Sequence, residues 1–134
     1  MTIPFGPQLI GQTEKTLNAL LETALAGRLS ETQWVTLRLA TQLADDVADA
    51  EDLARAVRDR ARLTDATSIV SSLTSAGLLH GGRPTERGRA FVTEIGDRVA
   101  ELAGPVFAGL PDDDVEATTR TLNRVLSRAR GALV

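Results

Sequence analysis

Apolar residues recur at helical spacing along almost the whole chain. The clearest example is Phe91, Ile95, Val99 and Leu102, which fall on one stripe of a long helix. Comparable stripes run through residues 10–25, 34–44, 53–61, 66–73 and 115–133. No stretch alternates between apolar and polar residues for long enough to build a sheet of any size. The pattern therefore predicts an all-α (mainly α) protein with at most one vestigial hairpin.

The ends of several helices can also be predicted. Ser30 is the expected N-cap of the second helix, with Gln33 as the candidate N3 residue but no complete capping box. Thr64 is the candidate cap of the fourth helix. Gly104-Pro105 is expected to stop or kink the fifth, because proline lacks an amide hydrogen. Residues 45–52 include five acids, which fit a connection followed by an acidic first helical turn.

Composition excludes several classes of chemistry. The 134 residues include no Cys and only one His, so a disulfide framework, a thiolate nucleophile and a cysteine zinc site are ruled out. His80 has no obvious partner to orient it as a base. The Asp clusters at 45–49 and 112–114 lack the pattern of a calcium loop. We therefore assign no catalytic residue, metal ligand or cofactor and do not expect an enzyme. With neither a signal peptide nor a membrane span expected, the predicted location is cytoplasmic.

The charge distribution is uneven. The net charge of −3 argues against a protein that coats nucleic acid non-specifically. From Leu53 to Ala90, however, the chain has seven Arg and three acids. A local basic surface is sufficient for contact with DNA phosphates.

Five segments together carry a family resemblance. They are "LSETQWVTLRLA" (29–40), "EDLARAV" (51–57), "TDATSIVSSLTSAGLL" (64–79), "PTERGRAFV" (84–92) and "FAGLPDDDVEATTRTLNRVL" (107–126). In this order and spacing, the chain resembles the MarR family of winged helix-turn-helix transcriptional regulators.

This resemblance implies a single domain over residues 1–134. Residues 29–85 would form the helix-turn-helix lobe, and residues 1–28 and 86–134 would supply long dimerisation helices. A homodimer would read a pseudo-palindromic operator in double-stranded DNA, with helix 64–76 in the major groove. The alternative is that the terminal helices close on the middle helices of the same chain.

The devices that read DNA in this family are reduced here. The recognition helix carries no Arg, which is the commonest reader of guanine. Where the family has its wing, this chain has only residues 80–83, which are sufficient for a tight turn but not for a projecting hairpin. The candidate DNA-binding residues are Arg55, Arg58, Arg62, Thr64, Thr67, Ser68, Ser71, Ser72 and Arg83. Arg55, Arg58 and Arg62 are expected to share a helix face. The alternatives are pairing of these arginines with Asp59 and neighbouring acids, and a merely solvated Ser/Thr surface.

The resemblance also implies a pocket for a small aromatic or anionic effector, between the dimerisation helices and the DNA-reading lobe. Its candidate lining is Phe5, Leu9, Trp34, Leu37 and Arg38. The alternative is that Trp34 and its neighbours simply belong to the core. The reduced DNA-reading surface leaves a second hypothesis open, in which the dimer has lost operator reading and acts as a small-molecule- or protein-binding module.

Overall fold

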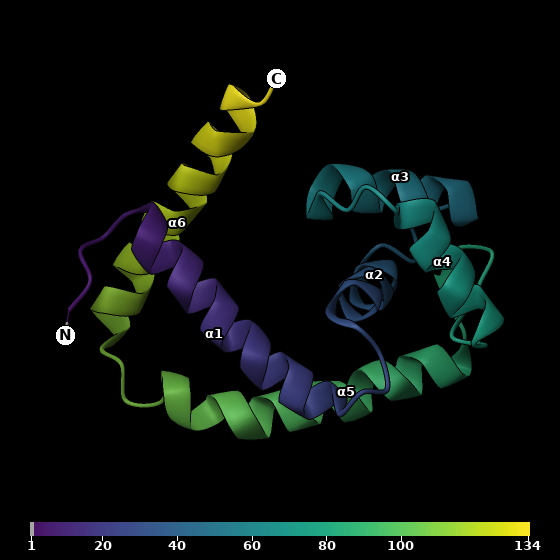
Figure 1. Cartoon of the computed structure of the whole chain (residues 1–134), viewed down its shortest axis with the longest axis horizontal. Helices are drawn as coiled ribbons and strands as arrows, with labels where there is room; N and C mark the ends of the chain where they lie inside the picture. Colours follow the sequence, from purple (N-terminus) through teal and green to yellow (C-terminus); the bar gives the residue numbers. More distant parts are fainter. Residues whose placement is uncertain (1) are drawn as a thin grey trace. The chain divides into compact units, whose positions relative to one another are not determined.

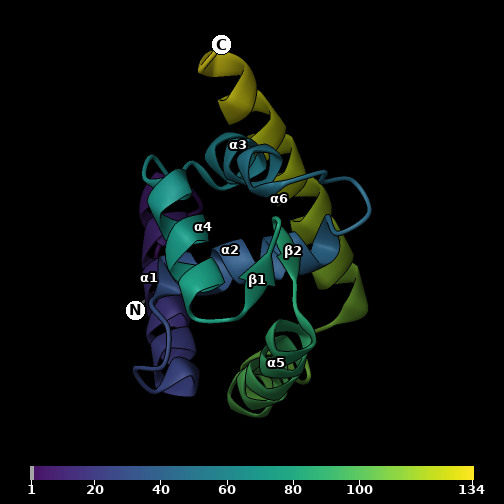
Figure 2. The same ribbon diagram turned by 90° about the vertical axis from the view of Figure 1, so that its right-hand side faces the viewer.

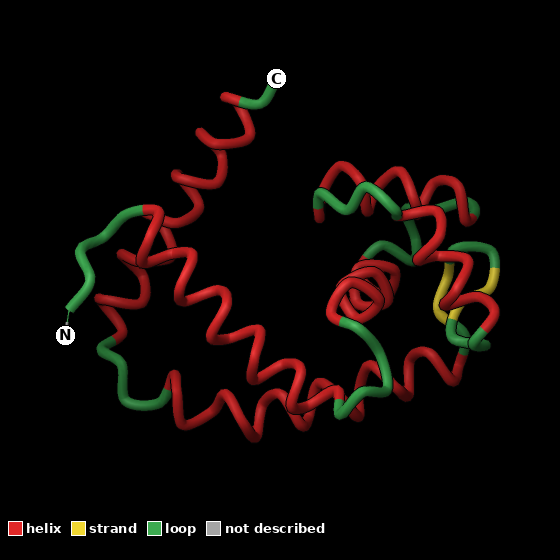
Figure 3. The backbone as a smooth tube through the Cα atoms, viewed as in Figure 1, coloured by secondary structure: helices red, strands yellow, loops and turns green. Residues whose placement is uncertain are grey.

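A computed structural model describes residues 2–134 of the chain, and this part is mainly helical (Figures 1 and 3). Residues 2–134 form six helices and two short strands: α1 (Pro7–Leu25), α2 (Glu31–Gln42), α3 (Ala50–Ala61), α4 (Ala66–Ser75), β1 (Leu79–His80), β2 (Arg83–Pro84), α5 (Glu86–Phe107) and α6 (Asp112–Ala132). The all-α class predicted from the apolar spacing is confirmed. None of these helices is both long and apolar enough to cross a membrane.

The chain divides into two compact units, one ending at Ala103 and the other comprising Gly104–Val134. Pro105 lies just beyond this division, within the last turn of α5. Gly104-Pro105 was expected to stop or kink the helix; the stop is not found, because α5 continues to Phe107, and the kink stays a prediction. Proline at this position removes only the amide that would bond to the carbonyl of Glu101, and the turn closes with Ala108 N–H donating to Gly104 O.

The core of the first unit lies where α2, α3, α4 and the β1–β2 hairpin meet. Figure 2 shows α3, α4 and the hairpin arranged around α2. Fully buried aliphatic side chains from each of these helices and from β1 fill the space: Leu37, Leu53, Val57, Leu73 and Leu79. A second cluster, made of Leu25, Trp34 and Ile95, joins the end of α1 to α2 and α5.

The caps of α2 and α4 differ from the prediction. The Ser30 hydroxyl accepts from Gln33 N–H, and the Gln33 carboxamide oxygen accepts from Ser30 N–H. The capping box of α2 is therefore complete, contrary to expectation. Thr64 does not cap α4; the N-cap residue is Asp65, whose side chain makes no capping hydrogen bond.

The hairpin is as short as the sequence predicts. Leu79 pairs with Pro84 and His80 with Arg83 in antiparallel register, and Gly81 and Gly82 form the turn. Both glycines have positive φ, which a two-residue hairpin turn of this kind requires. The tip is folded back on the start of α3, since a Cβ atom at Gly82 would clash with the carbonyl oxygen of Asp49.

The second unit consists of the end of α5 and the 21-residue helix α6. Pro111 precedes α6. The first turn of α6 contains Asp112, Asp113 and Asp114, whose negative charges interact favourably with the positive end of the helix dipole. No residue of α6 is buried.

Candidate nucleic-acid interface

Helices α3 and α4 form a compact helical pair joined by residues 62–65. Buried residues of α3, Leu53 and Val57, belong to the same cluster as Ala66 and Val70 of α4. Arg62 ends α3 as its C-cap residue and adopts a left-handed conformation with φ of 59°. This packing fixes one side of α4 against the core and leaves the opposite side in solvent.

The exposed side of α4 is made of hydroxyl side chains and carries no charge. Its members are Thr67, Ser68, Ser71, Thr74 and Ser75, and all five are exposed. Thr64, in the turn before the helix, is also exposed. The structure therefore brings together most of the Ser and Thr residues selected from the sequence. It adds Thr74 and Ser75, which the spacing from Thr67 and Ser71 could have indicated.

Ser72 is also exposed, but its hydroxyl has hydrogen-bond partners within the fold. Its hydroxyl donates to Ile69 O at 2.8 Å and accepts a hydrogen bond from the Gln33 side chain at 3.1 Å. Both bonds turn Ser72 toward α2. Ser72 is thus exposed like the other hydroxyl residues, but its own hydroxyl is engaged in the contact between α4 and α2.

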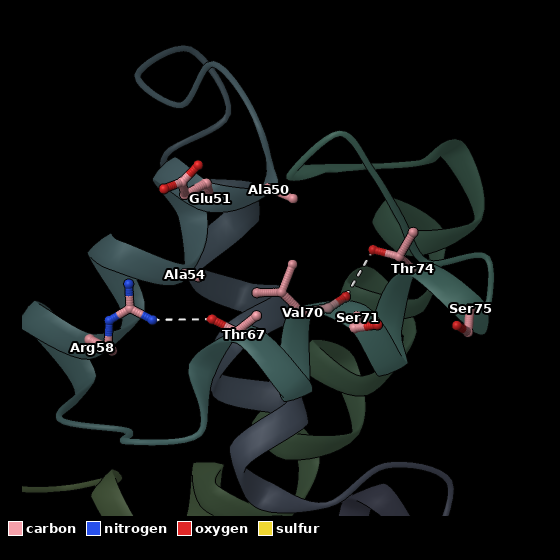
Figure 4. Close-up of a pocket in the computed structure, with 9 residues that line it drawn as sticks. All are labelled: Ala50, Glu51, Ala54, Arg58, Thr67, Val70, Ser71, Thr74 and Ser75. Carbon is pink, nitrogen blue, oxygen red and sulfur yellow. Dashed lines mark hydrogen bonds between the residues drawn. The ribbon is translucent and has the colours of Figure 1, made fainter.

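A groove runs between α3 and α4 (Figure 4). It encloses about 590 Å³ and is lined by Ala50, Glu51, Ala54, Arg58, Thr67, Val70, Ser71, Thr74 and Ser75. Arg58 spans it, with Nη1 donating to the Thr67 hydroxyl at 3.2 Å. Arg58 thus holds its guanidinium beside the first turn of α4. Most of its N–H groups are left for other acceptors.

The other candidate arginines are arranged differently. Arg55 pairs with Asp52 at 3.1 Å and with Glu51 at 3.9 Å, which supports the expectation of pairing with neighbouring acids but not with Asp59. Arg62 follows the last residue of α3, so the prediction that it shares a helix face with Arg55 and Arg58 is wrong. It is exposed in the connection to α4.

Arg83 is exposed, but its guanidinium is bonded to the backbone of the first unit. Its Nε donates to the backbone oxygen of Val47 at 3.3 Å, in the loop before α3. This contact, together with the seating of Gly82 on α3, holds the hairpin against the body of the first unit. A hairpin in this position does not project as a wing would.

A second pocket lies among α1, α2 and α3. It encloses about 440 Å³ and is lined by Leu21, Trp34, Val35, Arg38, Leu39, Gln42, Arg60 and Ala61. Two of the five predicted pocket residues, Trp34 and Arg38, therefore line one pocket. Leu37 is fully buried in the core, and neither Phe5 nor Leu9 lines this pocket. Arg60 was not anticipated, because only the packing of α3 brings it near Arg38.

An ion pair connects the loop after α1 to α5. Arg28 Nη1 lies 3.1 Å from Glu94 Oε1, and its guanidinium carbon lies 4.5 Å from the centre of the Phe91 ring. The hydrogen bond from Arg28, with its positive charge and that of Arg98, lowers the pKa of Glu94. Both partners are about half exposed, so this contact adds little to stability but orients the loop.

Comparisons of the chain with protein-family models, with curated proteins and with solved structures find no match. The resemblance to the MarR family therefore rests on the five sequence segments alone.

Proposed function

We propose that the protein is a dimeric DNA-binding transcriptional regulator of the MarR type. In this proposal α3 and α4 form the helix-turn-helix, and α4 enters the major groove of a pseudo-palindromic operator. The observation that carries the proposal is the uncharged hydroxyl surface of α4, held clear of the core beside the Arg58 guanidinium. An effector that occupies the pocket at Trp34 would change the spacing of the two DNA-reading units.

The chemistry of this surface predicts modest sequence selectivity. A hydroxyl can both donate and accept, so Ser68 and Ser71 can bond to several base edges or to phosphates. Arg58 and Arg62 would contact phosphates on either side of the groove, which positions α4 without reading sequence. Affinity would then come mainly from charge, and binding should weaken steeply as salt rises.

The test is fluorescence anisotropy of the full chain against labelled duplexes that tile the DNA upstream of its own gene, at several salt concentrations. Each phosphate contact contributes about −0.9 to the slope of log K against log salt. An Arg58→Ala dimer should therefore lose about two units of slope. Arg98→Ala, an exposed arginine on α5, is the matched control and should leave the slope unchanged. Wild-type binding to upstream duplexes no tighter than to random DNA would refute the proposal.

A gain-of-function variant tests whether the hydroxyl surface of α4 faces DNA. In the Ser68→Arg/Ser71→Arg variant, two guanidinium groups replace exposed hydroxyls without disturbing a core contact. If α4 enters the groove, this variant should bind DNA at least tenfold more tightly. A Glu14→Arg/Glu22→Arg variant on exposed positions of α1 adds even more positive charge and serves as the control. Equal gains in both variants would indicate a general charge effect and contradict the proposed docking.

A second candidate function is a ligand-binding module without operator reading. The pocket beside Trp34 favours it, because Arg38 and Arg60 both line an otherwise largely apolar space. Arginines beside an aromatic wall suit a small aromatic anion. Because Trp34 is the only Trp, titration with benzoate should change the intrinsic fluorescence of the wild type. The Arg60→Ala variant should weaken the response at least tenfold, and an unchanged response would contradict this assignment.

A further inference from the structure

The end of α4 lies beside the start of α5, although the β1–β2 hairpin separates them in sequence (Figure 1). The helix α4 ends in a Schellman motif, in which Leu78 N–H donates to Leu73 O at 3.0 Å. Gly77 N–H donates to Thr74 O, also at 3.0 Å, and the left-handed φ of 79° at Gly77 permits this ending. Residues 76–78 follow the helix, and no later turn of it supplies donors for their carbonyl oxygens.

Thr85, immediately before α5, and Arg87, in its first turn, supply the missing donors. The Thr85 hydroxyl donates to Gly77 O at 2.7 Å, and Thr85 N–H donates to Leu78 O at 3.0 Å. Arg87 Nη1 donates to Ala76 O at 3.2 Å. Three consecutive carbonyl oxygens after α4 are therefore bonded to Thr85 or Arg87.

Thr85 is bonded to both helix ends at once. Its hydroxyl oxygen also accepts from the N–H of Gly88, the third residue of α5, at 3.0 Å, so Thr85 occupies the N-cap position of that helix. Gly88 is buried, and a Cβ atom there would clash with Leu78 O. The first turn of α5 therefore packs directly against the chain that leaves α4, and one hydroxyl both caps α5 and holds Gly77.

The rest of α4 has fewer polar contacts with its neighbours. The side chain of its N-cap residue, Asp65, makes no capping hydrogen bond, and Arg58 reaches Thr67 through one bond at 3.2 Å. In the second half of the helix, Gln33 donates to Ser72. Apolar packing determines which side of α4 is buried, but it is non-directional, whereas hydrogen bonds depend on angle. The three bonds of the junction with α5 are therefore the largest set of directional contacts that holds α4.

We infer that Thr85 is a positioning residue, which fixes the tilt of α4 against α5 and hence the direction in which the hydroxyl surface of α4 faces. This role rests on the proposed function and deepens it, because Thr85 would orient the DNA-reading helix. The ten residues of α4 span about 15 Å, so a tilt of about 10° at its C-terminal end moves its first turn by about 2.6 Å. A displacement of this size approaches the length of a hydrogen bond and would take Thr67 and Ser68 out of reach of DNA.

Variants at position 85 separate the effect of the hydroxyl from that of the side-chain shape. Thr85→Val keeps nearly the same shape but has no hydroxyl, whereas Thr85→Ser retains the hydroxyl. Thr36→Val is the matched control, because the buried Thr36 hydroxyl donates to Thr32 O within α2 and this bond joins no second helix.

The tilt of α4 can be measured without DNA, from the amide residual dipolar couplings of the full chain by NMR. In Thr85→Val, the couplings of α4 should no longer fit the wild-type orientation relative to residues 86–103 of α5. Those of α2 should still fit, because Trp34 and Ile95 belong to one buried cluster that joins α2 to α5. Thr85→Ser and Thr36→Val should match the wild type at both helices.

A milder variant covers the case in which Thr85→Val does not fold. Arg87→Gln removes the guanidinium that bonds to Ala76 O and leaves both bonds from Thr85 in place. The couplings of α4 should then depart from the wild-type fit, whereas Arg89→Gln, at an exposed position of α5, should leave them unchanged.

The consequence for DNA is measured with the upstream duplexes. Thr85→Val should bind them about tenfold more weakly than the wild type, as expected when each subunit of a dimer loses about one hydrogen bond to DNA. Thr85→Ser should bind as tightly as the wild type, which a loss of the methyl group alone would not affect.

Each other outcome overturns part of this assignment. An unchanged orientation of α4 in Thr85→Val, or in Arg87→Gln if that variant is needed, would mean that Thr85 only caps α5. Equal reorientation in Thr85→Val and Thr36→Val would mean a general loosening of the fold and would contradict a positioning role. A reoriented α4 with unaltered DNA affinity would contradict the link to DNA reading. If α4 reorients only in Thr85→Val but the wild type binds no DNA, the proposed function fails, whereas the positioning of α4 by Thr85 is established independently.

Discussion

The seating of the hairpin on α3 can be tested with two neighbouring glycines. Gly81 and Gly82 form the turn with φ of 59° and 81°, so alanine at either position must adopt a left-handed conformation. That conformation costs an alanine about 1–2 kcal/mol. The surroundings differ, because a Cβ at Gly81 meets no described atom within 4 Å, whereas one at Gly82 clashes with Asp49 O and lies 2.9 Å from Ala50 N.

The contact between Gly82 and Asp49 should therefore make Gly82→Ala less stable than Gly81→Ala. In Gly82→Ala, relief of the clash requires the hairpin to move away from the start of α3. This movement breaks the hydrogen bond from Arg83 to Val47, worth about 1 kcal/mol. It also disturbs the Asp49 cap, whose side chain accepts from Asp52 N–H at 2.8 Å and contributes about 1 kcal/mol. Gly82→Ala should then lose about 2 kcal/mol more than Gly81→Ala.

The measurement is the free energy of unfolding from urea denaturation of both variants and the wild type, with equal m-values as the requirement for comparison. An Arg83→Ala variant, which removes one of the two contacts, should fall between wild type and Gly82→Ala. Equal losses of stability in Gly81→Ala and Gly82→Ala would refute the reasoning, because the hairpin tip would then not rest on α3.

Three further predictions follow from single contacts. Ser30→Ala should lower the free energy of unfolding by about 1 kcal/mol because it removes the side-chain cap of α2, whereas Thr64→Ala should change it little; urea denaturation measures both, and equal effects would contradict the observed caps. Leu73→Ala, at a fully buried position, should cost about 2–5 kcal/mol in the same assay, and a loss below 1 kcal/mol would contradict its core position. Because Arg28 lowers the pKa of Glu94 in the folded protein, the ion pair stabilises above the ordinary pKa of a glutamate and is lost as the pH falls through the lowered value. Lowering the pH from 7 into the acid range should therefore reduce the melting temperature of the wild type more than that of Glu94→Gln. Parallel plots of melting temperature against pH for the two proteins would exclude a role for the pair.

Most of the fold could be predicted from the sequence because it depends on local periodicity. The stripe from Phe91 to Leu102 specifies α5 without any knowledge of its neighbours. Helix ends were less predictable. Thr64 and Asp65 are adjacent residues of capping types, and neither side chain caps α4. A proline in the middle of a helix kinks or breaks it. Pro105 lies in the last turn of α5, so only two residues beyond it have to remain helical.

The candidate site was less predictable because its contacts join residues that are distant in sequence. Helical spacing correctly predicts that Ser72 is exposed, but not its hydrogen bond to Gln33, thirty-nine positions away. Arg83 was a candidate phosphate contact, yet Val47, thirty-six positions away, holds its Nε. Arg60 joins Arg38 only through the packing of α3 near α2. Helical spacing predicts the side of a helix on which a residue lies, but it does not predict which distant residue contacts that side.

These contacts reduce the positive charge that is available for DNA. Residues 53–90 include seven arginines, but Arg55 is paired with two acids and Arg83 is bonded to the backbone. Arg60 lies on the side of α3 that lines the pocket at Trp34. Arg87 donates to the backbone oxygen of Ala76 at the C-terminal end of α4, and Arg89 lies on α5. Arg58 and Arg62 are then the exposed arginines beside the first turn of α4, which gives about four phosphate contacts in a dimer. The slope of log K against log salt should accordingly be about −4. A slope twice as steep would mean that the Arg55 or Arg83 contacts open on DNA, and a slope near zero would remove the electrostatic basis of the proposed function.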